Sequence, residues 1–299
     1  MPLVTSGELM QDAMARKYAV GGFNAVNMES AQAIFAAAEE MRSPLLLQVT
    51  QTTLGYTEPE ELVACIKVLI DRSTVPVALH LDHGRSFAVC MRFLRLGFSS
   101  IMIDGSLDDT GKGPRTYEEN IEVTCKVREA AHALGVSVEA EIGRLGEIGT
   151  GAEALTDPDE AAEFVDATGV DLLAVGIGTT HGLYKPGGEP TIETDRVKAI
   201  AEKVDVPLVM HGGTGVPDRI VREGIENGIR KINIDTEIRR SFFDAVAGMV
   251  DQTRQEHAEA EAAGKAKKYD IRKILAPARE EAQKNLAAKM ELFGSAGKA

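Results

Sequence analysis

The chain has 299 residues and a formal net charge of -13 at pH 7, without a long block of Lys or Arg. This balance argues against a surface for nucleic acid or for an anionic membrane. It leaves a phosphorylated small substrate open, because backbone N–H groups and a few local cations suffice to bind a phosphate. The three cysteines, Cys65, Cys90 and Cys125, have no metal-ligand spacing and form no disulfide framework, which indicates a reducing compartment. The sequence shows neither a signal peptide nor an apolar run of roughly 18 residues, so we expect a cytoplasmic protein.

Short runs rich in β-forming residues alternate with longer amphipathic runs along the chain. The eight predicted strands are Gly21–Asn27, Pro44–Thr50, Pro76–Asp82, Ser99–Gly105, Ser137–Gly143, Leu172–Gly178, Pro207–Gly213 and Ile229–Asp235. The helices predicted between them are Ser30–Met41, Glu58–Asp71, Ser86–Leu96, Tyr117–Leu134, Asp159–Thr168, Thr194–Val204 and Asp218–Asn227. Strict alternation indicates a parallel sheet, and eight such units predict a (β/α)8 barrel, an α/β fold.

The prediction for domains is one barrel over residues 1–299, with the barrel at about 20–240 and a helical C-terminal extension at about 241–299. Ser6–Lys17 predicts an extra helix before the first strand. The tail, Thr236–Phe293, predicts one or two long helices and a link, and its Glu256–Lys268 segment is interpreted as a solvated helix or, alternatively, a subunit contact. Asp104–Thr116 and Arg144–Leu155 are predicted loops at the C-terminal ends of strands, where barrel enzymes keep their working residues.

Three histidines are predicted to follow different strands at the same end of the barrel. His83 lies in the motif His80-Leu81-Asp82-His83-Gly84 at the end of the third strand, His181 lies just past the sixth strand, and His211 lies near the end of the seventh. Three imidazoles that converge on one mouth match the plan of catalytic zinc, which keeps an open position for substrate. The alternative is a set of unrelated, hydrogen-bonded polar residues. His80 is expected to be a core or supporting residue, because it lies two residues before Asp82 on the strand.

Two glycine-rich stretches follow the histidine-bearing strands, at 178–182 and 211–215, and strand eight ends in Asn233-Ile234-Asp235-Thr236. In barrels, the loops after strands seven and eight often hold a phosphate with backbone N–H groups and small hydroxyls. Neither stretch has the spacing of a dinucleotide-binding or Walker motif, which disfavours a dehydrogenase or a kinase.

Taken together, these motifs resemble those of the class II, metal-dependent ketose-bisphosphate aldolases of the fructose- and tagatose-bisphosphate type. The resemblance runs from about Ser6 into the tail and comprises HLDHG at 80–84, EAEIG at 139–143, GTTHG at 178–182, HGGTG at 211–215 and NIDTE at 233–237. It implies reversible aldol cleavage, zinc, a monovalent cation (Na⁺ or K⁺) near the glycines, and a homodimer or homotetramer.

The resemblance also implies roles for individual residues. His83, His181 and His211 would hold Zn²⁺, with Asp104 and Glu141 near the metal and at an alternate metal position. Asp82 would move the proton at the oxygen of the aldehyde half. The residues expected to bind the substrate and its phosphates are Asn24, Gln48, Gly182, Gly212, Thr214, Asn233, Asp235 and Thr236.

Two regions depart from the family pattern. The loop after strand five offers Glu147 as its one close acidic candidate for the base at the dihydroxyacetone carbon, and Asp108–Thr116 resembles an insertion.

In the tail, Arg272 matches the family's arginine for the far phosphate, and Arg279 is a second candidate.

The leading expectation is cleavage of fructose 1,6-bisphosphate to dihydroxyacetone phosphate and glyceraldehyde 3-phosphate. The alternatives are an aldolase for tagatose 1,6-bisphosphate or another ketose phosphate, a metal-dependent hydrolase, and a structural barrel subunit. A hydrolase of this fold often carries a His-x-His pair on strand one, and Gly21–Asn27 has no histidine. A Schiff-base aldolase would need a lysine at a strand end, whereas Lys231 lies near the start of strand eight.

Overall fold

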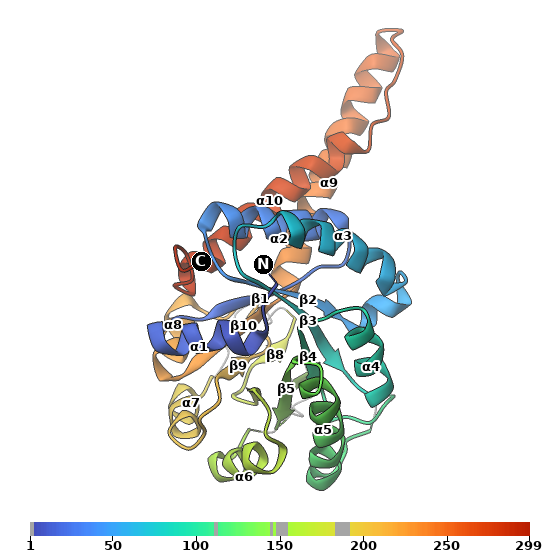
Figure 1. The fold of residues 1–299 in the computed structure, drawn as a ribbon. Coiled ribbons are helices and arrows are strands. Elements are labelled where there is room, and N and C mark those ends of the chain that lie inside the picture. Colours follow the sequence, from blue (N-terminus) through green and yellow to red (C-terminus); the bar gives the residue numbers. More distant parts are fainter. Residues whose placement is uncertain (1–2, 111–112, 144–145, 148–154, 183–191) are drawn as a thin grey trace.

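The computed structural model describes residues 3–299 apart from 111–112, 144–145, 148–154 and 183–191, and for Glu147 and His181 it describes the backbone alone. Eight parallel strands close into a barrel in the order β1, β10, β9, β7, β5, β4, β3, β2 (Figure 1). Their bounds are β1 Val20–Asn24, β2 Leu45–Thr50, β3 Val77–Gly84, β4 Ser100–Ile103, β5 Ser137–Ile142, β7 Leu172–Val175, β9 Leu208–Met210 and β10 Ile229–Ile234. The predicted (β/α)8 barrel is confirmed.

Helices surround the barrel (Figure 1). They are α1 Ser6–Arg16, α2 Met28–Met41, α3 Pro59–Arg72, α4 Phe87–Arg95, α5 Tyr117–His132, α6 Pro158–Thr168, α7 Thr194–Ala201, α8 Asp218–Asn227, α9 Thr236–Ala262 and α10 Arg272–Leu292, with a 3-10 helix at Gln51–Gly55. Each predicted helix is present, and the tail forms two.

The predicted first strand extends too far. It ends at Asn24, and Asn27 caps α2 instead, because its side chain accepts a hydrogen bond from the backbone N–H of Ser30. The sixth and seventh strands also end earlier than predicted, at Val175 and Met210. After the sixth strand the apolar pattern continues beyond Val175, as with the buried Ile177. A further, unpredicted parallel pair joins β6 (Gly146–Glu147) to β8 (Thr180–His181).

Helix α1 closes the N-terminal end of the barrel. It contributes Leu9, Met10 and Ala13 to an inner apolar cluster with barrel residues such as Leu46 and Met102. A second, larger cluster fills the space between the strands and the outer helices. The lower barrel is therefore a packed core, as expected for this fold, and polar groups are left to the upper layers.

Alternation along each strand sets which side chains point into the barrel. Lys231 on β10 contacts both Glu139 on β5 and His80 on β3, and these strands are not neighbours in the sheet. Such contacts are possible only through the barrel interior. Residues two positions further along the strands point the same way, toward the C-terminal mouth.

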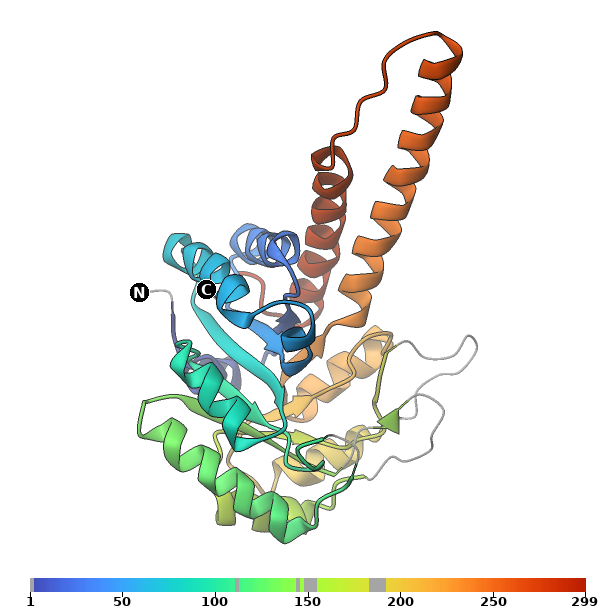
Figure 2. The same ribbon diagram turned by 90° about the vertical axis from the view of Figure 1, so that its right-hand side faces the viewer.

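The two C-terminal helices form an arm that extends beyond the barrel (Figure 2). Helix α9 leads away from the end of β10, and α10 returns to pack against α2 and α9. The chain end is fixed to the barrel wall, because Ser295 Oγ lies 2.8 Å from Ser43 Oγ. Along α9 only Ile238 is buried, and Phe243 is 70% exposed. The arm thus presents surface that this subunit does not cover.

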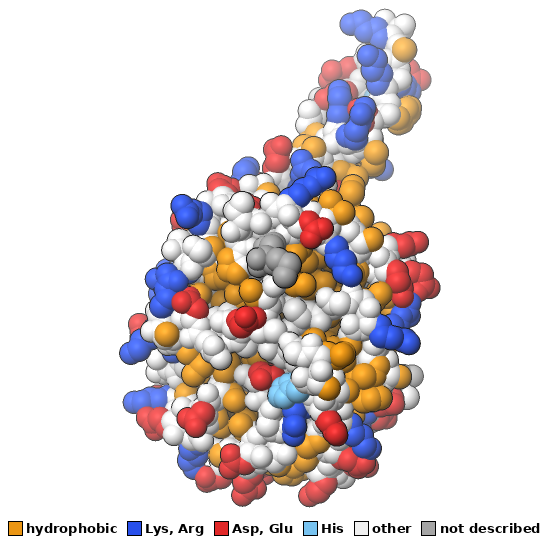
Figure 3. Space-filling model, in the orientation of Figure 1, with side chains coloured by type: hydrophobic (Ala, Val, Ile, Leu, Met, Phe, Trp, Pro, Cys, Tyr) orange, Lys and Arg blue, Asp and Glu red, His pale blue; other side chains and the backbone are white. Residues whose placement is uncertain are grey.

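The face that α1 covers carries acidic and basic side chains interspersed around its rim (Figure 3). The tip of the arm shows a gathering of basic side chains in the same view. Among the described residues, no helix combines the length and the apolar character needed to cross a membrane.

The predicted insertion, Asp108–Thr116, folds back on itself in its described part. Leu107 pairs with Pro114 in an antiparallel bridge, and the carboxylate of Asp108 accepts a hydrogen bond from the backbone N–H of Gly113 at 3.2 Å. The segment therefore begins and ends beside the same point of the barrel mouth.

Candidate active site

The candidate site lies at the mouth of the barrel, on side chains at the C-terminal ends of β3, β4, β5, β9 and β10. His83 Nδ1 is 3.1 Å from Asp104 Oδ2, and His83 Nε2 is 3.0 Å from His211 Nδ1. The two rings meet edge to face with centroids 4.7 Å apart. The backbone of His83 has φ +52°, a left-handed conformation that is uncommon for a residue with a side chain. Such strained backbone conformations cluster at functional positions.

Opposite charges set the protonation of this cluster. Burial would lower the pKa of His83, but the carboxylates of Asp82, Asp104 and Glu141 raise it to about 10. Burial favours the neutral form of Asp104, yet its hydrogen bond to His83 and the charge of that ring hold the pKa of Asp104 below its usual value. For Glu141, burial and the charge of Asp104 raise the pKa to about 8. The cluster thus concentrates negative charge around the His83 imidazole, which suits a cation.

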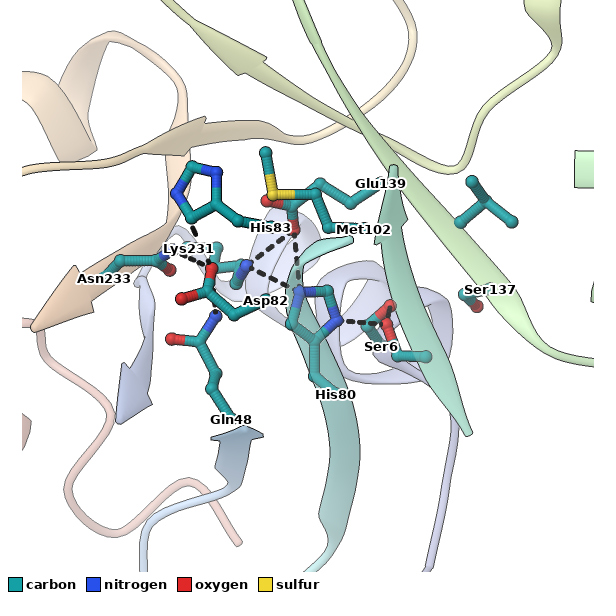
Figure 4. Close-up of polar contacts among 12 residues, drawn as sticks. Ser6, Gln48, His80, Asp82, His83, Met102, Ser137, Glu139, Lys231 and Asn233 are labelled. Atoms are coloured by element: carbon teal, nitrogen blue, oxygen red, sulfur yellow. Dashed lines mark hydrogen bonds and ion pairs between the residues drawn. The ribbon is translucent and has the colours of Figure 1, made fainter. Parts of the chain in front are cut away.

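Asp82 is a buried carboxylate that accepts hydrogen bonds from two asparagine amides, one of which, Asn233, is seen beside it in Figure 4. Asn24 Nδ2 donates to its Oδ2 at 2.9 Å, and Asn233 Nδ2 donates to its Oδ1 at 3.3 Å. Burial tends to raise the pKa of Asp82, but the nearby charges of His83, His211 and Lys231 hold it below the usual value. Asp82 is therefore an oriented, ionised carboxylate at neutral pH.

Two sets of side chains bring metal-binding atoms within 4.8 Å of one another: Asp82 with His83 and His211, and His83 with Asp104 and Glu141. In the second set, Glu141 Oε2 is buried without a hydrogen-bond partner among the described residues. A buried carboxylate oxygen is costly unless it is paired. Imidazole and carboxylate atoms are ligands that zinc takes, so the residues present fit such an ion.

His181 and Glu147 are placed by their backbones only. Strand β8 ends at His181 and pairs with β6, so that Gly146 lies opposite Thr180 and Glu147 opposite His181. The predicted roles of both side chains, as metal ligand and as base, fall outside the described residues. Their backbones nevertheless lie side by side, on loops that leave β5 and β7.

A cavity of about 150 Å³ connects the imidazoles with a glycine-rich wall. Its lining residues are Asn24, Thr50, Asp82, His83, Gly182, His211, Gly212, Thr214, Asn233, Asp235 and Thr236. Gly212 has φ +65°, and a Cβ there would lie 2.4 Å from the carbonyl oxygen of Thr180, so only glycine fits. Helix α9 begins at Thr236 and presents the backbone N–H groups of its first turn, an arrangement that favours anions.

Comparison with known proteins agrees with this geometry. A family model described as fructose-bisphosphate aldolase class-II matches residues 4–298. The chain belongs to this family. It is 41% identical to the fructose-bisphosphate aldolase of Thermus caldophilus, across 99% of this chain and 100% of that protein. It is 39% identical to the fructose-bisphosphate aldolase of Xanthobacter flavus, across 100% of this chain and 93% of that protein. Among solved structures, the YdjI aldolase from Escherichia coli K12 aligns with a TM-score of 0.84 and 32% identity, covering 99% of each chain.

The expectation of a class II aldolase is thus confirmed, and members of this family are metal-dependent aldehyde-lyases. Three of the predicted substrate residues lie elsewhere than the cavity of this class II aldolase. Gln48 is fully buried beneath Asn24. Arg272 lies at the start of α10 with a side chain that is 86% exposed, and it pairs with Asp270. Arg279 donates to Gln32 on α2.

Sequence reasoning missed Thr50, which lines the cavity, and the buried contact between Lys231 and Glu139 below the cavity. Thr50 follows Gln48 by two positions at the end of β2, and this spacing was the available signal. The sequence excludes Lys231 as a Schiff-base lysine, because it lies near the start of strand eight, but offers no role for it; in the structure it is fully buried and its Nζ lies 2.6 Å from Glu139 Oε2. Glu139 in turn contacts the His211 ring.

Proposed function

We propose that this class II aldolase reversibly cleaves a ketose bisphosphate, with fructose 1,6-bisphosphate as the leading substrate and dihydroxyacetone phosphate and glyceraldehyde 3-phosphate as products. The observation that carries the proposal is the cavity itself. One wall bears Asp82, His83 and His211, and the other bears glycines and the start of α9. A phosphate on the second wall would place the adjoining carbons of a sugar against the first. Two relatives, from Xanthobacter flavus and Thermus caldophilus, are named fructose-bisphosphate aldolases, which supports the same substrate.

The metal in this proposal is Zn²⁺. His83, His181 and His211 would hold it, while Asp104 and Glu141 would serve an alternate or second position. When bound, the ion would supply Lewis-acid stabilisation of the negative charge that cleavage leaves on the three-carbon ketose fragment. A monovalent cation, Na⁺ or K⁺, is proposed near the glycines.

Asp82 carries the proton transfer at the aldehyde half. During cleavage its carboxylate accepts the proton of the substrate hydroxyl that becomes the aldehyde, and during condensation it returns that proton. Asn24 and Asn233 aim its two oxygens, so the acceptor is oriented before substrate binds. Glu147, on the loop after β5, is proposed to exchange the proton at the dihydroxyacetone carbon, a separate step.

The phosphate of the dihydroxyacetone half is proposed to lie against Gly182, Gly212 and Thr214, at the N-terminus of α9. The first-turn N–H groups of α9 and the hydroxyl of Thr236 donate to it. Asn233 and Asp235 are proposed to bind the adjacent substrate hydroxyls. This assignment concerns the half of the substrate that every ketose phosphate shares.

The second phosphate calls for a cation, and the described residues that line the cavity include no Lys or Arg. Arg272 would meet it only if the arm of one subunit reached the cavity of another. The assignment of Arg272 is therefore linked to the proposed homodimer or homotetramer, which the largely exposed helix α9 supports. We expect this assembly to work in the cytoplasm.

The test is a coupled assay for dihydroxyacetone phosphate with metal-loaded protein over fructose 1,6-bisphosphate, tagatose 1,6-bisphosphate and ketose 1-phosphates. Activity should disappear after chelation and return with zinc. Release of inorganic phosphate is measured in parallel, because it would reveal a hydrolase. The proposal fails if the zinc-loaded protein cleaves no ketose phosphate, or if activity survives complete removal of metal.

A further inference from the structure

A layer of buried polar residues lies directly beneath the cavity floor (Figure 4). Gln48, His80, Glu139 and Lys231 are each 0% exposed. Each lies two positions before a residue of the mouth, so its side chain points into the same interior one level lower. The layer separates the apolar core above α1 from the candidate site.

Lys231 is the centre of this layer, and its ammonium has three donors to place. Nζ lies 2.6 Å from Glu139 Oε2 and 3.3 Å from His80 Nε2. The third partner is Gln48. With the amide turned so that its oxygen faces Lys231 at 3.1 Å, the amide nitrogen donates to Asn24 Oδ1 at 3.0 Å and to the Gly22 carbonyl at 2.9 Å. The opposite orientation offers only a long 3.5 Å contact to Asp82, and a buried amide favours the satisfied one.

One branch from Lys231 leads to the imidazole of His211. Glu139 Oε2 binds Lys231, and its Oε1 lies 3.0 Å from His211 Nε2. An ionised carboxylate can only accept, so Nε2 of His211 carries the hydrogen. Nδ1 then keeps its lone pair and faces His83 Nε2 at 3.0 Å, on the side of the proposed metal. Glu139 thereby fixes both the tautomer and the direction of this ring.

A second branch leads to the proton acceptor. Lys231 holds Gln48, Gln48 donates to Asn24 Oδ1, and Asn24 Nδ2 donates to Asp82 Oδ2 at 2.9 Å. Because Gln48 occupies the oxygen of Asn24, the amide nitrogen of Asn24 is turned toward Asp82. The rotamer of Asn24 is thus set from below.

A third branch runs downward to α1. His80 Nδ1 is 2.7 Å from Ser100 Oγ, and Ser100 donates to Ser6 Oγ at 2.7 Å, in the first turn of α1. Burial and the charge of Lys231 keep His80 neutral by lowering its pKa, which agrees with Nε2 as an acceptor. This branch anchors the layer to the helix that closes the barrel, and it touches neither Asp82 nor His211.

We propose that Lys231 is a positioning residue that orients the metal-ligand imidazole of His211 through Glu139 and the carboxylate of Asp82 through Gln48 and Asn24. A buried ion pair is a weak means of stabilising a fold, since apolar residues of similar volume often serve as well or better. The Lys231–Glu139 pair instead connects His211 with Asp82, and the proposed reaction depends on how these two side chains are placed relative to each other. The inference rests on the proposed metal site and reaction.

The test uses the double variant Lys231→Met/Glu139→Leu, which removes both charges and leaves neither unpaired. Zinc affinity is measured by competition with a chromophoric chelator, without substrate, and thermal unfolding of the metal-free protein is recorded beside it. We expect a folded protein whose zinc affinity is lower by about 10–100-fold, as for other residues that orient metal ligands. In the zinc-saturated state kcat should fall while KM stays close to wild type.

Two further variants keep the test decisive. Glu139→Gln retains the volume and should still lower zinc affinity within the same range, even if the double variant fails to fold. Lys126→Met, in the exposed pair with Glu122 on α5, is the matched control and should change nothing.

A purely structural pair predicts that folded variants bind zinc and turn over like wild type, and that outcome overturns the positioning role alone. A wild-type protein that binds no divalent metal overturns the proposed function and this inference with it.

Discussion

Replacing Asp82 with asparagine tests the division of labour in the site. The variant keeps the shape of the side chain but cannot accept the substrate proton. Asp82 receives amide donors on both oxygens, from Asn24 and Asn233, and an amide has one oxygen. One of these bonds is therefore lost, which would cost about 1.5–3 kcal/mol for a hydrogen bond to a charged group. Removal of a buried charge offsets part of that cost. We expect the free energy of unfolding to change by no more than about 2 kcal/mol.

The catalytic effect should be larger than the effect on stability. Loss of an acid/base group typically lowers a rate by about 10²–10⁴-fold, which corresponds to a rise of about 3–5 kcal/mol in the activation free energy of the cleavage step. Cleavage should fall by this factor. Hydrogen exchange at the dihydroxyacetone carbon should persist to a substantial degree, because that step is assigned to another residue.

Three measurements on Asp82→Asn decide the matter: zinc content, the cleavage rate, and exchange of the carbon-bound hydrogen of dihydroxyacetone phosphate with solvent. Retained zinc, slow cleavage and persistent exchange are expected. An equal loss of cleavage and exchange, with zinc still bound, would show that Asp82 serves the carbon proton. Loss of zinc would make Asp82 a metal ligand and refute the reasoning, and its Oδ1 does lie 4.0 Å from His83 Nε2.

Further predictions concern the metal, the phosphate and pH. His211→Ala should lose most bound zinc, whereas the exposed His257→Ala control should not; metal analysis that finds a full complement in active His211→Ala protein would contradict the assignment. Asn233→Ala and Asp235→Ala should raise KM for fructose and tagatose bisphosphates alike, and wild-type kinetics in both variants would argue against a role for them in binding the dihydroxyacetone-phosphate half. In the metal-free protein, His83 has a pKa of about 10 against 6.5 for an ordinary histidine, so the folded state holds its proton more tightly. That contribution to stability is complete below about pH 6.5 and is lost as the pH rises toward 10. Urea unfolding of the chelated protein from pH 6 to pH 10 should therefore show a falling free energy of unfolding, and a rise over this range would exclude His83 as the controlling group.

The helices were predictable from the sequence, because their apolar residues recur with the helical period over several turns. Each helix has an apolar face, and several begin at a visible cap, as α6 does with Asp157 before Pro158. The strand ends were less predictable, because apolar residues can continue beyond the strand, as Ile177 does after β7. A two-residue strand such as β8 has no period at all, and only tertiary pairing with β6 creates it.

The residues of the candidate site were predictable to the extent that they occupy strand ends. His83, His211, Asp82 and Asn233 were found in this way, and the structure brings them together. Gln48 shows the limit of the method. Its type and position suit a substrate contact, but its depth in the barrel is fixed by the register of β2 against β3, which pairs Gln48 with His80. That register is a property of the closed barrel and not of the local sequence.

The same register decides which polar side chains of the barrel line the cavity and which lie below it. Side chains that share a strand face are two residues apart, so an inward-facing residue of the upper barrel has a neighbour on the same strand one level below it. Where that neighbour is apolar, as Ala78 is beneath His80, it can only pack. Where it is polar, it can direct the group above or across from it, as Glu139 does for His211. A lysine near the start of a strand can therefore orient groups at the mouth. Lys231 does not reach the mouth itself, but its side chain crosses the barrel interior to Glu139, and Glu139 contacts His211.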